Sequence, residues 1–362
     1  MPTVFFAFRD APDRRAALRS PGVLDRYRLF GLDEVRERGA EVCHNLERAG
    51  PPVWARVLGK LTNTLVDLLG GYGGDFASAF ASLRAAKRAD VVFATADTLA
   101  LPLLLLKRAG LLGPPLVYTP IGLPERLTQV RRRRLYASAL RCAHTIVTYS
   151  RAEADWLRDW IGSDAPEIVF VPFGVDTEAF RPSHSTPDID VVAVGADPRR
   201  DFELLKAVAL RRPELTFRIV ATKEQVMALG ALPAHVAVES DISLEEVRDR
   251  LARARVVALP VRPNSYSGAT TVLLQAMALA QPVVVSRTDA IADGYGLEDG
   301  VNCRLVDPGD PDAFERALLD VLSNPGDLGV QGREMVERDF SWGQYIDALW
   351  DILSRAWERE PS

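Results

Sequence analysis

The chain has 362 residues, 48% of them hydrophobic, so it carries enough apolar material for ordered cores and is not a disordered protein. Its length favours two domains over one, and its formal net charge of −5 excludes a general electrostatic attraction to nucleic acid. Three cysteines lack metal-site or disulfide spacing, no apolar run reaches bilayer length and no leader pattern precedes the first strand, so a cytoplasmic location is expected.

Short apolar runs alternate with helical patterns along the first half of the chain. Such runs are typical of strands buried on both faces, and we expect four of them, at residues 4–8, 91–94, 116–118 and 145–148. A further strand is expected from residue 168, broken at Pro172 and Gly174. A helix is expected over residues 27–39, with Gly39 at its end. Residues 99–112 are interpreted as a core helix rather than a membrane insertion.

A second series of strands is expected at residues 190–194, 217–221, 235–238, 256–260 and 282–286. Because strands alternate with helices in both series, the sequence predicts an α/β fold with parallel sheets and two Rossmann-like domains. Ligands in such folds bind beyond the carboxyl ends of the strands, so the expected site is the cleft between the domains. The last predicted helix, residues 344–357, is amphipathic.

A small-residue loop follows the strand that ends at Pro260, and a helix is expected to open near Gly268. The first-turn amides of a helix have no intrahelical partners, and the positive end of the helix dipole assists anion binding there. The segment therefore predicts a phosphate pocket, although an ordinary capped helix has the same local composition.

Two segments resemble the family 4 retaining glycosyltransferases. The first, residues 171–182, reads VPFGVDTEAFRP, with Phe173 where that family usually has Asn. The second runs over residues 259–310 and contains GATTVLLQAMA and DGVNCRLVDPGD. The resemblance implies a GT-B fold, no required metal or other cofactor, and a nucleoside diphosphate sugar donor (a UDP- or GDP-sugar) held mainly by the C-terminal domain.

The same resemblance suggests where the domains begin and end. Residues 1–170 would form an acceptor-binding domain and 171–187 a linker. Residues 188–340 would form the nucleotide-sugar-binding domain, and residues 341–362 a helix that crosses back to the N-terminal domain.

Two departures from the family pattern concern its catalytic groups. The family has Glu-x7-Glu across the loop and helix, where this chain has Ser267 and Gln275. Gln275 can still hydrogen-bond a ribose hydroxyl, whereas Ser267 supplies no carboxylate near the transferred sugar. The family also tends to place a His after an N-terminal strand, and the comparable loop here contains none.

Cations for a diphosphate are expected in the loop after residue 194, where the resemblance implies an Arg. Arg200 is the first candidate and Arg199 the second, because a guanidinium binds two phosphate oxygens at once; the alternative is that both are solvated. Lys223 could replace the missing family Lys, and Asp241 and Ile242 lie where the base edge would be recognised. The predicted catalytic residues are Arg200 and Ser267, and the predicted donor-binding residues are Gly195, Arg199, Arg200, Lys223, Asp241, Ile242, Ser267, Gly268, Ala269, Thr270, Thr271 and Gln275.

On the acceptor side, the candidates follow two predicted strands of the N-terminal half: Arg9, Asp10, Thr119 and Gly122. The run Arg131–Arg134 begins a predicted helix and has three interpretations. It could bind anionic lipid at the inner face of the membrane, attract an anionic acceptor, or form a solvated helix face.

The leading hypothesis is a retaining, metal-independent glycosyltransferase with an unidentified acceptor (a small molecule, a glycan or a lipid-linked group). The missing Glu pair and His motivate an alternative, a non-catalytic nucleotide-sugar-binding or scaffold protein. An unusual coupling enzyme that uses the same cleft is a further alternative. No nucleic-acid partner is expected, and the oligomeric state is not predicted.

Overall fold

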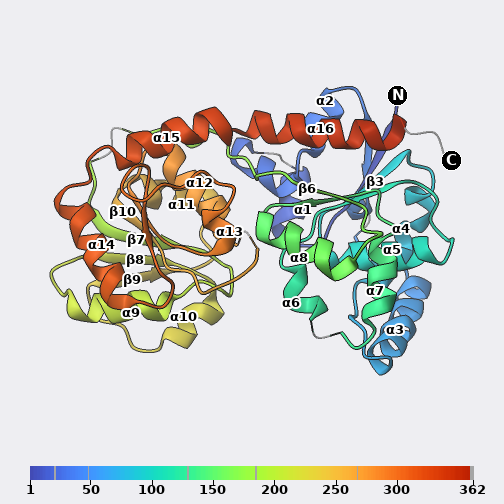
Figure 1. Cartoon of the computed structure of the whole chain (residues 1–362), viewed down its shortest axis with the longest axis horizontal. Helices are drawn as coiled ribbons and strands as arrows, with labels where there is room; N and C mark the ends of the chain where they lie inside the picture. The colour runs from blue at the N-terminus through green and yellow to red at the C-terminus, as the bar shows by residue number, and fades with distance from the viewer. Residues whose placement is uncertain (20–21, 48, 129, 184–185, 267, 359–362) are drawn as a thin grey trace. The chain divides into compact units, whose positions relative to one another are not determined.

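The computed structural model describes residues 1–19, 22–47, 49–128, 130–183, 186–266 and 268–358. The chain divides into two compact units: unit 1 comprises residues 1–171 and the chain from Ile346 onward, and unit 2 comprises Pro172–Tyr345. The division falls inside the last helix, α16 (Trp342–Glu358). Helices flank a parallel sheet in each unit (Figure 1).

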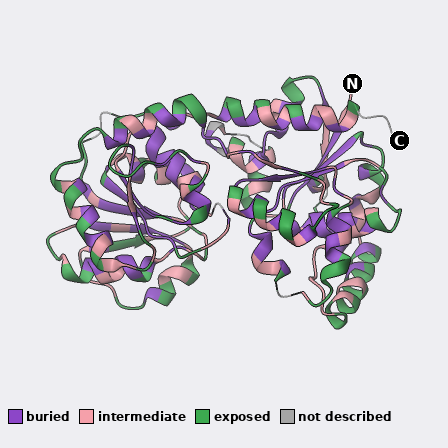
Figure 2. Ribbon diagram, in the orientation of Figure 1, coloured by how far each residue is buried: buried purple, intermediate pink, exposed green. Residues whose placement is uncertain are grey.

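The sheet of unit 1 has six parallel strands in the order β2-β1-β3-β4-β5-β6. Its register places Phe5 opposite both Cys43 and Val92. The inner strands are buried throughout, as their continuous apolar runs require, and they appear purple in Figure 2. The bounds are β1 (Thr3–Ala7), β2 (Glu41–His44), β3 (Val91–Ala94), β4 (Leu116–Tyr118), β5 (Thr145–Thr148) and β6 (Glu167–Phe170).

The helices of unit 1 cover this sheet and carry its connections. They are α1 (Pro12–Arg19), the 3-10 helices η1 (Val23–Leu29) and η2 (Asn45–Glu47), α2 (Leu32–Glu37), α3 (Val53–Leu68), α4 (Phe76–Ala86), α5 (Asp97–Arg108), α6 (Leu123–Leu127), α7 (Arg133–Leu140) and α8 (Arg151–Ile161).

Unit 2 contains the second parallel sheet, in the order β12-β11-β10-β7-β8-β9. Its strands are β7 (Ile189–Val194), β8 (Phe217–Val220), β9 (Val236–Glu239), β10 (Ala254–Leu259), β11 (Val283–Ser286) and β12 (Arg304–Val306). Its helices are α9 (Phe202–Arg211), α10 (Lys223–Leu229), α11 (Leu244–Ala252), α12 (Thr270–Ala278), α13 (Asp289–Ala292), α14 (Pro311–Ser323) and α15 (Leu328–Asp339), followed by the start of α16.

The first of the two family-like segments, residues 171–182, is packed within unit 2. Phe173 lies edge-on to Trp342, with ring centroids 5.7 Å apart, and contacts Tyr345 at 5.0 Å. Asp176 accepts hydrogen bonds from the amides of Glu178 and Ala179, which closes a turn within this segment.

The α/β class and the two parallel sheets are confirmed, and every expected strand is present within two residues. The edge strands β2 and β12 were not expected, because their partly exposed sequences lack a continuous apolar run. The single helix over residues 27–39 is wrong. Phe30 (φ 52°) and Gly31 (φ 85°) both adopt the left-handed conformation, which ends η1 and starts α2 separately.

The interpretation of residues 99–112 as a core helix is confirmed by α5. Its side chains Leu99, Leu103 and Leu104 are at most 1% exposed, and Pro102 is accommodated inside the helix. Among the described residues, no helix is both long enough and apolar enough to cross a membrane.

Candidate functional site

Two loops at the carboxyl ends of neighbouring strands in unit 2 are joined by backbone hydrogen bonds. Arg200, in the loop after β7, forms an antiparallel bridge with Val261, in the loop after β10. The amide of Asp201 donates to the carbonyl of Pro260 at 2.9 Å, and the amide of Arg262 donates to the carbonyl of Arg199 at 2.8 Å. These bonds fix one loop against the other at the sheet edge where ligands bind in such folds.

The side chain of Arg200 is the most unusual group at this edge. Arg200 is 4% exposed, and its Nε and Nη1 atoms are buried without a hydrogen-bond partner among the described residues. Burial lowers the pKa of its guanidinium to about 10, so the group stays protonated at neutral pH. A buried cation with unused donors is costly unless an anion occupies them, which suits a phosphate ligand.

Gly195 leaves the space in which the Arg200 side chain lies. A Cβ atom on Gly195 would be 2.2 Å from Arg200 Nε and 2.9 Å from Cζ. Gly268 plays a similar part on the other loop, because a Cβ there would be 2.6 Å from an oxygen of Asp197. Tyr266 Oη donates to that carboxylate, at 2.9 and 3.0 Å from its two oxygens. The two predicted glycines are therefore required by close packing around Arg200 and Asp197.

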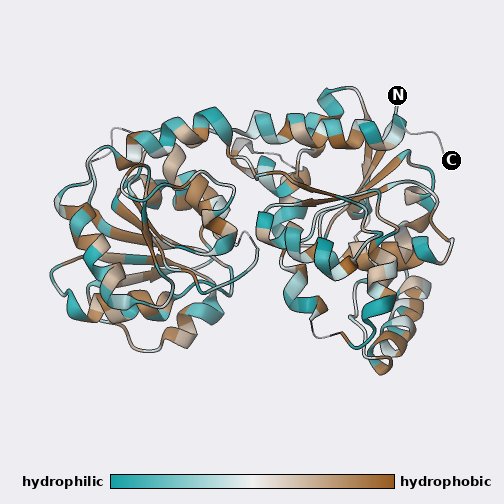
Figure 3. Ribbon diagram, viewed as in Figure 1, coloured by the Kyte–Doolittle hydropathy of each residue, from teal (hydrophilic) through white to brown (hydrophobic). Residues whose placement is uncertain are grey.

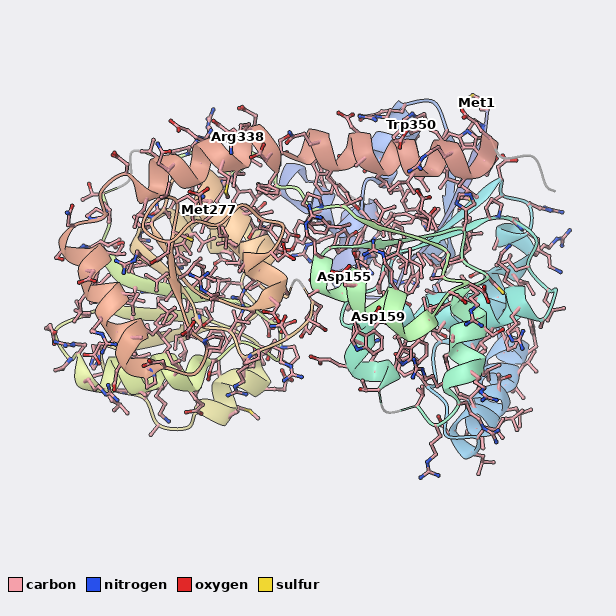
Figure 4. All side chains as sticks on the ribbon, viewed as in Figure 1. Met1, Asp155, Asp159, Met277, Arg338 and Trp350 are labelled. Atoms are coloured by element: carbon pink, nitrogen blue, oxygen red, sulfur yellow. The ribbon has the colours of Figure 1, made fainter. Side chains whose placement is uncertain are left out.

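The helix expected near Gly268 begins two residues later, at Thr270, with Ala269 as its N-cap and no side-chain capping bond. Ala269 and Thr270 are each 1% exposed, and Gln275 is 4% exposed on the same helix. Thr271 is half-buried in the first turn. Ser267 lies outside the described residues. Figure 4 labels Met277, which is fully buried one residue before the end of this helix.

The other predicted donor residues lie at the ends of β8 and β9. Lys223 forms an ion pair with Asp241, and both side chains are about two-thirds exposed, at 68% and 65%. This hydrogen bond raises the pKa of Lys223. Ile242 is half-buried next to Asp241. The structure thus pairs two predicted site residues with each other.

In unit 1, the four predicted acceptor residues follow β1 and β4. Arg9 and Asp10 are exposed, and Asp10 is held by Arg15, whose Nε donates to Oδ1 at 2.6 Å and lowers the pKa of the carboxyl. Asp10 also lines a cavity of about 370 Å³. Thr119 is fully buried, and its Oγ1 has no partner among the described residues.

Gly122 has φ 74°, and its loop is fastened by a buried carboxylate that the sequence analysis did not identify. Glu153, in the first turn of α8, accepts hydrogen bonds at Oε1 from the amides of Gly122 and Leu123, both at 3.0 Å. Glu153 is 1% exposed, and its Oε2 is buried without a described partner. Burial, with the charge of Asp97 as a further contribution, raises the pKa of Glu153 to about 8.

Asp97 belongs to the same buried group. It follows β3, is 3% exposed, and pairs with Arg126 at 2.8 Å. Tyr118 Oη, at the end of β4, donates to its other oxygen. Burial raises the pKa of Asp97 and Tyr118. Ser150 follows a strand and stands three residues before Glu153, and Ser-x-x-Glu is the pattern of a capping box at the start of a helix. That pattern is the sequence signal that could have located Glu153.

Two sequence models of known families match the chain over separate segments. The model described as "Glycosyltransferase Family 4" matches residues 36–179, and "Glycosyl transferases group 1" matches residues 188–324. The chain belongs to the family 4 glycosyltransferases. The first match falls mainly in unit 1 and the second falls within unit 2, so both halves of the chain carry the family pattern.

Curated relatives of this family 4 glycosyltransferase align with part of the chain. The MMP alpha-(1->4)-mannosyltransferase of Mycolicibacterium hassiacum is 33% identical over 212 residues, covering 54% of this chain and 50% of that protein. The D-inositol 3-phosphate glycosyltransferase of Kineococcus radiotolerans is 26% identical, covering 59% of this chain and 58% of that protein. The chain therefore aligns with little more than half the length of these relatives.

Solved structures agree with the GT-B fold of this family 4 glycosyltransferase. Sucrose-phosphate synthase from Thermosynechococcus elongatus has a TM-score of 0.73 at 17% identity, covering 98% of this chain and 99% of that chain. The Anabaena protein HepE in complex with UDP-glucose has a TM-score of 0.71 at 17% identity, covering 98% of this chain and 100% of that chain.

Proposed function

We propose that the chain is a retaining glycosyltransferase that moves a sugar from a nucleoside diphosphate sugar to an acceptor hydroxyl. The observation that supports this most strongly is Arg200, a buried guanidinium that Gly195 places at the carboxyl edge of the unit 2 sheet and that has two nitrogens without a partner among the described residues. A diphosphate offers several oxygens to such a fork of donors. The HepE complexes with UDP and UDP-glucose support a nucleotide sugar as the donor.

In the reaction, the bond between the anomeric carbon and the diphosphate oxygen breaks, and the acceptor oxygen bonds to that carbon from the same face. The acceptor proton passes to the departing diphosphate. Arg200 and the first amides of α12 stabilise the negative charge that develops there. Lys223 would have to leave Asp241 first, so we give it a lesser role.

The acceptor contacts are assigned to unit 1, and specifically to Thr119. Its hydroxyl is buried and has no described partner, and its loop is held by Glu153 through the amides that follow it. Glu153 is a positioning residue in this proposal, because it acts on the loop rather than on a reacting atom.

Proton NMR of a UDP- or GDP-sugar incubated with the protein tests this proposal, because water can replace the acceptor in slow hydrolysis. We expect free sugar that first appears with the anomeric configuration of the donor, at an unchanged rate in EDTA. Inverted sugar would overturn the retaining mechanism, and loss of release in EDTA would overturn metal independence. Donor binding without sugar release over a set of acceptors would favour the non-catalytic alternative, in which Ser267 and Gln275 have replaced the family carboxylates.

A further inference from the structure

Helix α3 presents large apolar side chains to solvent. Eight of the 17 exposed large apolar residues that the structure describes fall within residues 53–69. Among them Trp54 is 57% exposed, Leu61 64%, Leu65 57% and Leu68 79%. The helix carries brown hydrophobic positions in Figure 3, and much of its length is green in Figure 2.

These side chains share one side of the helix. At about 100° per residue, all eight fall within an arc of about 160°. The opposite side packs on unit 1 through small residues: Ala55 is fully buried, and a Cβ on Gly59 would be 2.6 Å from the amide nitrogen of Ala77 in α4. The fold therefore uses the small residues of α3 and leaves the large apolar ones outside.

Basic residues adjoin this apolar side. The amide of Arg131 donates to the carbonyl of Gly70 at 2.9 Å, and Nε of Arg132 donates to the carbonyl of Leu69 at 3.2 Å. The run 131–134 is exposed throughout. Arg56 and Lys60 are exposed on α3 at the border of the apolar arc, and Asp67 is the one acidic residue within Val53–Leu68.

We propose that the α3 face, meaning the exposed apolar side of α3 together with residues 131–134, docks the protein on an anionic lipid bilayer. The apolar arc enters the boundary between headgroups and acyl chains with the helix parallel to the surface, and the arginines contact the lipid phosphates. This specifies the membrane contact that the sequence suggested for Arg131–Arg134 and adds its apolar element.

The charge of the α3 face favours lipid over a second copy of the chain. In a two-fold symmetric dimer the same patch faces itself, so two surfaces that both carry an excess of positive charge would be brought together. A bilayer with anionic headgroups instead supplies the opposite charge, and that attraction weakens with salt.

Flotation of the full chain with vesicles tests the proposal, with no nucleotide present, so that its outcome is independent of donor binding. We expect binding to vesicles of phosphatidylcholine mixed with phosphatidylglycerol, weaker binding to phosphatidylcholine alone, and release by high salt. Leu61→Asp/Leu65→Asp should lower binding about tenfold or more, and Arg131→Ala/Arg134→Ala should lower it on the anionic vesicles only.

A matched control is Met227→Asp/Val330→Asp, which adds the same charge at two exposed apolar positions of unit 2, 76% and 53% exposed, and should bind as the unaltered chain does. Thermal unfolding checks that each variant is folded. No binding by the unaltered chain, or binding unaffected by the α3 substitutions, would overturn the proposal. So would a dimer that forms without vesicles and becomes monomeric in Leu61→Asp/Leu65→Asp.

Discussion

Arg200 was a candidate from the sequence because an Arg was expected in its loop, but its burial was not predictable. Nor was it predictable that its Nε and Nη1 atoms have no hydrogen-bond partner in the part of the chain that the structure describes. A run of two arginines in a loop is typical of a solvated segment, and only the contacts with Gly195 and the loop after β10 place one of them inside. Arg199, by contrast, is only half-buried.

Gly195→Ala should weaken binding of a nucleoside diphosphate without unfolding the chain. Its Cβ would lie 2.2 Å from Arg200 Nε, so the guanidinium must move. Losing one charge-assisted hydrogen bond corresponds to roughly tenfold weaker binding or more. Calorimetric titration measures it. Gly113→Ala is the control, because a Cβ there meets nothing within 4 Å, and equal affinities in the two variants would contradict the role of Gly195.

Glu153→Gln should change how stability depends on pH. The pKa of Glu153 is about 8 in the folded chain against an ordinary value of 4.5, so between those values the folded state binds a proton that the unfolded state has lost. The stabilisation that this extra proton gives the folded state is therefore fully present below pH 4.5 and is lost as pH rises toward 8. Between these values the free energy of unfolding falls by at most about 1.4 kcal/mol per pH unit.

The glutamine keeps an acceptor for the amides of Gly122 and Leu123 but removes this slope, which urea unfolding at several pH values measures. Asp155→Asn is the control, since Asp155 lies on the same helix with a side chain 70% exposed (Figure 4). A pH profile of Glu153→Gln that coincides with that of the unaltered chain would contradict the raised pKa.

Among the elements, the strands were predictable because continuous apolar runs indicate burial on both faces. The break between η1 and α2 was not, because the helical pattern continues across Phe30 and Gly31. The exposed side of α3 was also hidden in the sequence, since an apolar stripe normally indicates the packed face of a helix. Only the close contact of Gly59 with α4 shows that small residues form the packed side.

Gly31→Ala should destabilise unit 1 more than Gly39→Ala. Both glycines have positive φ, 85° and 97°, so an alanine costs about 1–2 kcal/mol at either position. Gly31 also faces α16, where a Cβ would lie 2.6 Å from Ile346 Cδ1, whereas a Cβ on Gly39 meets nothing within 4 Å. Overpacking adds about 1–3 kcal/mol. Chemical denaturation measures both variants, and equal losses would show that Ile346 yields without cost.

For the whole chain, the sequence was more informative about donor binding than about acceptor binding. The half proposed to bind the donor has a glycine and a helix N-terminus that suit a phosphate, and an arginine in the loop where the family resemblance implies one. The half proposed to bind the acceptor has a buried group that joins Asp97, Arg126 and Glu153 from separate segments of the chain, and only the Ser150-x-x-Glu153 pattern gives a local signal for it. Charge also separates the halves: residues 1–182 carry a net +5 and residues 183–362 a net −10.

The central claim is that Arg200 binds a nucleoside diphosphate. Calorimetric titration of UDP and GDP tests it most directly, with the unaltered chain compared with the variants Arg200→Met and Arg262→Met. Arg262 lies in the adjoining loop with a side chain 48% exposed, so its loss removes the same charge without emptying the buried site. We expect micromolar binding of one nucleotide, about 100-fold weaker in Arg200→Met and little changed in Arg262→Met, with a thermal unfolding midpoint for Arg200→Met that is not lowered. No binding of either nucleotide by the unaltered chain, or equal binding by Arg200→Met, would contradict the account.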